Sequence, residues 1–168
     1  MPTVFEAPAR PKISPQIYDA AAAITSERLE NRIPSEELIT CFDSDAIDFA
    51  INLRTHTAHC IDASDVSILD RMNETIDSLV AKAQIAWLKE FAIEPQLAVG
   101  DEVEIIHPRT KVLANGVVSE INHSNRLSII HPATYSVRFP KDNELSSWLL
   151  QYEEVEAQIF SVPPSNPV

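Results

Sequence analysis

Glycine is almost absent from this 168-residue chain, which contains only Gly100 and Gly116. The first 99 residues therefore cannot supply a glycine-rich oxyanion-hole loop for nucleophilic catalysis, and no cofactor-binding motif is recognisable anywhere in the chain. Cysteine is scarce as well. Cys41 and Cys60 are too few for a disulfide framework, which is typical of a protein from a reducing compartment.

The chain also has few basic residues and no long apolar runs. The chain has 13 lysines and arginines against 25 aspartates and glutamates, for a net charge of −12. This excess repels nucleic acid and anionic lipid at long range, so we expect neither as a partner. No apolar stretch reaches the roughly 20 residues that span a bilayer, and the N-terminus lacks the apolar run of a signal peptide. We therefore expect an acidic cytoplasmic protein that binds no cofactor and contacts no membrane.

The pattern of apolar residues changes once along the chain, near Glu94 and Pro95. Residues 14–94 have helical spacing and residues 98–160 alternate with a period of two, which predicts an α+β protein. The prolines in residues 1–13 and 161–168 predict extended tails at both ends, because proline fixes φ and removes a backbone donor.

Three or four helices are predicted in the first region. One follows Ser14 and Pro15, a second begins at Ser35, and a third covers 43–56. The longest runs from Ser64, a plausible N-cap, to about Ile93. It carries an apolar stripe of Leu69, Met72, Ile76, Leu79, Ala83 and Trp87. A helix of that length measures about 45 Å, so we expect it to kink or to present a flank to a partner.

Five strands are predicted in the second region, at 102–107, 116–122, 127–131, 135–139 and 155–160. The dipeptides Asn115-Gly116 and Ser124-Asn125 are typical of turns between strands. Glycine serves tight turns and close backbone approaches, and helices have no need of it. Both glycines therefore fall where strands are expected.

Four short motifs in this region follow one another in the order of a known fold. They are Gly100-Asp101-Glu102-Val103, Gly116-Val117-Val118, Tyr135-Ser136-Val137-Arg138-Phe139 and Tyr152-Glu153-Glu154-Val155. The stretch 98–160 resembles the SH3-like small barrels. These include KOW- and Tudor-type domains, the peripheral barrel subunit of photosystem I, the variable chain of ferredoxin–thioredoxin reductase and the β-chain barrel of nitrile hydratase.

That resemblance implies a five-stranded SH3-like barrel after the helical region. Between Val99 and Ser147 the only aromatic residues are Tyr135 and Phe139, too few for the aromatic cage of a Tudor-type domain. The stretch is also acidic, whereas ribosomal KOW barrels are basic. The resemblance to docking and scaffold barrels of electron-transfer proteins conflicts least with the charge.

Cys41, His56, His59 and Cys60 are the candidate metal ligands or nucleophiles. Zinc sites usually pair their ligands in a compact loop, but 14 residues separate Cys41 from His56, and adjacent His59 and Cys60 cannot easily bind one ion. The alternative is a helix end with histidines near its carbonyls and a buried cysteine.

The tetrapeptide Ile-Ile-His-Pro occurs twice, with histidines at His107 and His131. If each ends a strand of a meander, the two side chains lie at one rim and could form a pH-sensitive or partner-binding site. The simpler alternative is that each proline ends a strand beside an edge histidine. Arg109, Trp148 and Tyr152 are the other candidate partner-binding residues.

These patterns favour a non-enzymatic accessory or adaptor protein that binds a protein partner, or a second copy of itself, through the barrel and the long helix. A nucleic-acid-binding or transcription-associated protein that uses the barrel is the alternative. A metal-binding protein or enzyme centred on the cysteines and histidines is the third possibility.

Overall fold

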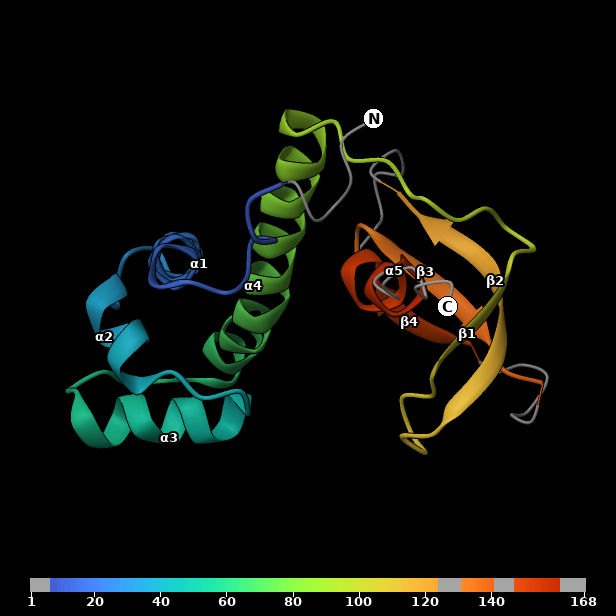
Figure 1. The fold of residues 1–168 in the computed structure, drawn as a ribbon. Helices are drawn as coiled ribbons and strands as arrows, with labels where there is room; N and C mark the ends of the chain where they lie inside the picture. The colour runs from blue at the N-terminus through green and yellow to red at the C-terminus, as the bar shows by residue number, and fades with distance from the viewer. Residues whose placement is uncertain (1–6, 124–130, 141–146, 161–168) are drawn as a thin grey trace, which may run out of the picture. The chain divides into compact units, whose positions relative to one another are not determined.

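The chain forms two compact units in the computed structural model, which describes residues 7–123, 131–140 and 147–160. Pro11–Ala83 make up a helical unit, whereas Met1–Arg10 and Gln84–Val168 together make up a sheet unit. Helices come first along the chain, and the strands and one further helix follow (Figure 1), so the predicted α+β class is confirmed, although the predicted barrel is not. The sheet unit is built from two separate stretches of sequence.

The helical unit contains helices α1 (Pro15–Arg28), α2 (Ser35–Cys41) and α3 (Ala46–His56) and most of α4 (Ala63–Glu90). Pro15 stands in the first turn of α1, as predicted, and Asp45 caps α3 by accepting hydrogen bonds from the backbone of Ile47 and Asp48. The core of the unit is apolar and includes Ala21, Leu29, Ile33, Leu38, Phe49, Leu53, Leu69, Met72 and Ile76.

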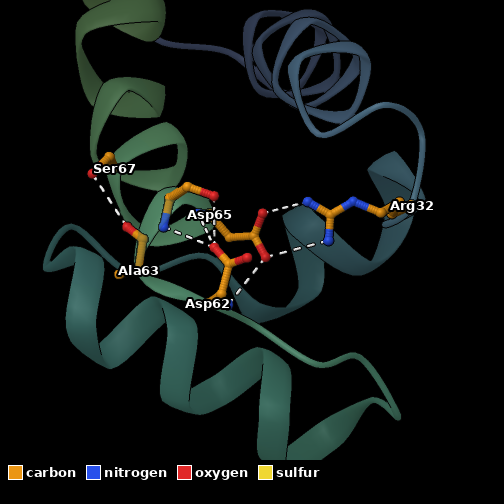
Figure 2. Close-up of polar contacts among 6 residues, drawn as sticks. Arg32, Asp62, Ala63, Asp65 and Ser67 are labelled. Atoms are coloured by element: carbon orange, nitrogen blue, oxygen red, sulfur yellow. Dashed lines mark hydrogen bonds and ion pairs between the residues drawn. The ribbon is translucent and has the colours of Figure 1, made fainter.

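Helix α4 begins one residue after Asp62, and Asp62 rather than the predicted Ser64 is its cap. Oδ1 of Asp62 accepts hydrogen bonds from the backbone N–H groups of Ser64 (2.7 Å) and Asp65 (3.0 Å). Asp65 reciprocates by accepting from the backbone N–H of Asp62 (3.1 Å), which completes a capping box. Figure 2 shows the guanidinium of Arg32 pointing at the buried Asp65 carboxylate, with which it pairs.

The described residues of the sheet unit form four strands, β1 (Glu102–Ile106), β2 (Leu113–Asn122), β3 (Thr134–Arg138) and β4 (Trp148–Gln151), followed by helix α5 (Tyr152–Phe160). Each strand pairs antiparallel with the next, in the order β1-β2-β3-β4. The described residues therefore form an open four-stranded sheet, and the prediction of a closed five-stranded SH3-like barrel is wrong. The core of this unit includes Leu88, Ile93, Val103, Ile105, Val118, Tyr135, Val137, Tyr152 and Val155.

The predicted last strand, 155–160, is part of helix α5. The buried residues of α5 are Tyr152, Val155 and Glu156. Val155 and Glu156 lie three and four positions after Tyr152, which is helical spacing. Helix α5 contacts both edge strands, β1 and β4, so a helix takes the place that the prediction gave to a fifth strand. Of the predicted strand 127–131, all but the last residue lies outside the described residues, and β4 was not predicted.

The predicted turn at Asn115-Gly116 is also wrong, because both residues lie inside β2 opposite Glu104 and Val103. A Cβ atom on Gly116 would lie 2.6 Å from Cγ1 of Val137, so glycine is needed there for the close approach of β3. Gly100 has a φ of +98°, a conformation that favours glycine. The turn between β1 and β2 lies instead at 107–112.

Among the residues that the structure describes, no helix has both the length and the apolar character required to cross a membrane.

Candidate functional site

A pocket of about 600 Å³ opens beside the turn that joins β1 to β2. Strand β1 contributes Glu104, and Pro140 follows the end of β3. The turn and the start of β2 supply the remaining wall. The lining residues are Glu104, His107, Thr110, Val112, Leu113, Ala114, Asn115 and Pro140.

His107 organises the turn that forms one wall of this pocket. Its backbone N–H donates to the carbonyl of Val112 (2.9 Å), and its carbonyl accepts from the backbone N–H of Lys111 (2.9 Å). Its ring Nδ1 accepts hydrogen bonds from the backbone N–H groups of Arg109 (3.1 Å) and Thr110 (3.2 Å). Because Nδ1 is an acceptor, the proton of the neutral ring is on Nε2. The imidazole thus stabilises the conformation of the turn by accepting hydrogen bonds from its backbone.

Trp148 supports the same histidine. His107 is only 4% exposed, and its ring packs edge-on against Phe139 and Trp148, with ring centroids 4.4 and 5.4 Å away. The structure therefore brings together two of the predicted partner-binding residues, His107 and Trp148. Arg109 lies exposed in the turn next to them.

Large apolar side chains are exposed around the pocket. Val112 is 64% exposed, Leu113 57% and Ile106 50%. Ile106 and Leu113 are direct cross-strand partners, and Leu113 lines the pocket together with Val112, so we call these three side chains the hairpin patch. Two positions along the strands, and therefore on the same face, the pair Glu104 and Asn115 is polar and also lines the pocket. An apolar surface thus lies directly beside a carboxylate.

His131 and Tyr152 do not belong to this site. His107 follows the end of β1 that pairs with Leu113 at the start of β2, whereas His131 precedes β3, whose first residue pairs with Asn122 at the far end of β2. The two histidines therefore lie toward opposite ends of the sheet and form no common rim. Tyr152 is fully buried in the core of the sheet unit.

Three of the four candidate metal ligands line a second hollow of about 390 Å³ in the helical unit. Cys41, His56 and His59 lie there with Glu37, and Nε2 of His59 is 2.8 Å from Oε2 of Glu37. Burial and the nearby Glu37 raise the pKa of the Cys41 thiol, which disfavours the thiolate needed for metal binding or nucleophilic attack. Cys60 is exposed and does not line the hollow. Within the described ranges, no three His, Cys, Asp or Glu side chains are arranged to hold a metal ion.

A buried polar cluster in the sheet unit was missed by the sequence reasoning. Oε1 of Glu156 accepts hydrogen bonds from the hydroxyl of Tyr135 (2.6 Å) and from the backbone N–H of Gln96 (3.1 Å). The tyrosine oxygen also accepts from the backbone N–H of Leu97 (3.2 Å). The cluster ties the segment after α4 to the sheet. The sequence signal for this cluster was the helical spacing of Glu156 relative to Tyr152, which places the glutamate on the buried face of a helix.

A second polar cluster surrounds Arg10, which the sequence analysis placed in an extended tail. Its side chain is buried against the sheet unit and pairs with Glu153. Nothing in the local sequence signals this contact, because its partners lie more than 120 residues away in the chain.

The chain was compared with protein-family models, with curated proteins and with solved structures, and it matches none of them.

Proposed function

We propose that this protein is a non-enzymatic accessory or adaptor protein that binds a protein partner at the pocket beside the β1–β2 turn. The observation that carries this proposal is the hairpin patch of Ile106, Val112 and Leu113 at the edge of the pocket. Contiguous exposed apolar surface rimmed by polar residues is characteristic of interaction sites.

The chemistry of the pocket defines the segment that fits it. The hairpin patch favours a large apolar side chain, and the carboxylate of Glu104 in the wall favours a basic residue beside it. Glu102 extends the exposed acidic surface along β1, and the chain carries a net charge of −12. The occupant is therefore an apolar and basic segment of a partner protein.

A binding role agrees better than catalysis with the state of His107. Its Nδ1 is engaged by two backbone N–H groups, so that nitrogen maintains the turn and is not available as a base. No serine or cysteine is among the residues that line the pocket.

The hairpin, and not the long helix, carries the contact in this proposal. No large apolar side chain of α4, all of whose residues are described, is among the exposed ones. We place the protein in the cytoplasm, where the free thiols of Cys41 and Cys60 stay reduced.

Affinity capture with full-length variants tests the proposal. Leu113→Asp adds a negative charge to the hairpin patch, and Ile47→Asp is the matched control because Ile47 on α3 is 64% exposed. We expect the wild type and Ile47→Asp to capture the same partner, and Leu113→Asp to lose it. A Glu104→Lys variant should also lose it. Capture of the same proteins by all four chains, or of none by the wild type, would contradict the proposal.

A further inference from the structure

Arg10 occupies a site in the sheet unit that is built to hold an arginine. Its side chain is 4% exposed. The residues around it come from α4, from the segment before β3 and from α5, and all of them belong to the same unit as Arg10. The N-terminal segment, defined as residues 7–10, thus sits on the sheet unit as a bound peptide would.

The guanidinium is contacted from three directions. Its two terminal nitrogens donate to the carbonyls of Pro132 (3.3 Å) and Ala133 (2.5 Å). Its Nε lies 2.8 Å from Oε1 of Glu153, in an ion pair whose N–H is not aligned for a hydrogen bond. Two carbonyls and a carboxylate match the planar fork of an arginine, and the single ammonium of lysine cannot reach all three.

Trp87 contacts both the Arg10 side chain and the backbone of the N-terminal segment. The Arg10 guanidinium lies 5.9 Å from the centre of its ring, within cation–π distance. The indole Nε1 donates to the carbonyl of Pro8 (2.9 Å), two residues before the arginine. The site therefore contacts a backbone carbonyl two residues before the arginine as well as the charge of the arginine itself.

Glu153 retains binding capacity that Arg10 does not use. Its Oε2 is buried and has no hydrogen-bond partner among the described residues. Burial lowers the pKa of Arg10, and the Glu153 carboxylate partly offsets this effect. A buried carboxylate oxygen without a donor is costly, and Arg10 leaves this one acceptor of the site unsatisfied.

We propose that this cluster is a receptor site for an arginine in an extended segment of a partner protein, and that the chain's own N-terminal segment occupies it as an intramolecular competitor. This site shares no residue with the pocket beside the β1–β2 turn, so the inference is independent of the proposed function. A tethered segment competes at an effective concentration on the order of millimolar, so a free ligand at micromolar concentration is excluded while Arg10 is in place.

A labelled peptide and the full-length chain test this inference. The probe is a fluorescein-labelled peptide with the sequence of residues 7–12, Ala-Pro-Ala-Arg-Pro-Lys, titrated by fluorescence anisotropy. We expect Arg10→Ala to bind it at least tenfold more tightly than the wild type does. A peptide with alanine in place of the arginine should not bind, and adding Glu153→Gln to Arg10→Ala should abolish binding of the original peptide.

Two further measurements keep the test decisive if Arg10→Ala unfolds the sheet unit. Arg10→Lys keeps a positive charge without the planar fork and should also gain affinity for the peptide. In the wild type, a spin-labelled peptide at millimolar concentration should broaden the indole N–H resonance of Trp87. The inference is overturned if folded Arg10→Ala or Arg10→Lys binds no better than the wild type, if the alanine peptide binds equally well, or if the Trp87 resonance is unaffected.

Discussion

The hydroxyl of Tyr135 donates a 2.6 Å hydrogen bond to Oε1 of Glu156, and both side chains are fully buried. Burial raises the pKa of Glu156, and the nearby Glu153 adds to this, while the hydrogen bonds from Tyr135 and Gln96 oppose it. Oε2 of Glu156 has no hydrogen-bond partner among the described residues. The protonated form is therefore favoured in the folded protein relative to the unfolded chain.

This relationship predicts that the sheet unit loses stability as the pH rises. A glutamate whose folded pKa lies above its unfolded value of about 4.3 stabilises fully below that value and less as the pH rises through the folded pKa. Glu156→Gln removes the titration and the cost of a buried charge. We expect thermal unfolding between pH 4 and 8 to show a declining melting temperature for the wild type and a smaller decline for Glu156→Gln. Parallel curves would exclude Glu156 as the cause.

Gly116→Ala should destabilise the sheet. The added Cβ would lie 2.6 Å from Cγ1 of Val137 and 3.2 Å from the backbone carbonyl of Arg138, and the backbone atom cannot rotate away. Overpacking of this kind costs about 1–3 kcal/mol. Urea unfolding gives the free energy of unfolding, and Asn115→Ala, at the exposed neighbouring position of β2, is the control and should change it little.

Lys111→Gly should stabilise the turn between β1 and β2. Lys111 has a φ of 58°, in the left-handed region that glycine adopts without steric cost. Relief of this strain, less the greater flexibility of glycine in the unfolded chain, leaves a gain of about 0.5–1 kcal/mol. Lys89→Gly, an exposed position in the last turn of α4, is the matched substitution and should destabilise instead. A loss of stability in Lys111→Gly would show that the lysine side chain makes a larger contribution than the strain.

Asp62→Ala should destabilise the helical unit. It removes the oxygen that accepts from the backbone N–H groups of Ser64 and Asp65 at the start of α4. Loss of an N-cap costs about 0.5–2 kcal/mol. Asp70→Ala, at an exposed position farther along the same helix, is the control for loss of charge. Equal melting temperatures of the two variants, measured by circular dichroism, would argue against a capping role.

The sequence predicted what depends on near neighbours and failed where distant contacts decide. The helices were found because proline, capping residues and apolar stripes act within a few positions. Strand β1 was found for the same reason. Helix α5 was mistaken for a strand because the resemblance to a barrel outweighed the helical spacing of Tyr152, Val155 and Glu156.

The candidate site was predicted only in part. His107, Arg109 and Trp148 fall at or beside the pocket. The prediction that His107 lies next to His131 assumed a third strand that ends at His131, whereas His131 precedes β3 at the other end of the sheet. The environment of Arg10 could not be predicted, because the carbonyls it contacts belong to Pro132 and Ala133. The exposed patch at Val112 and Leu113 depends on where the turn lies, and the glycine in Asn115-Gly116 drew that prediction to the wrong position.

The division of the chain into units has a consequence for biosynthesis. Residues 11–83 form one uninterrupted unit, whereas the sheet unit combines residues 7–10 with the described residues that follow Ala83. As the chain leaves the ribosome, the helical unit can fold as soon as it emerges, but the N-terminal segment must wait for the residues that bury Arg10. Residues 7–10 are thus synthesised before the helical unit, but they dock only after synthesis has reached Glu153, the most C-terminal of the residues that contact Arg10.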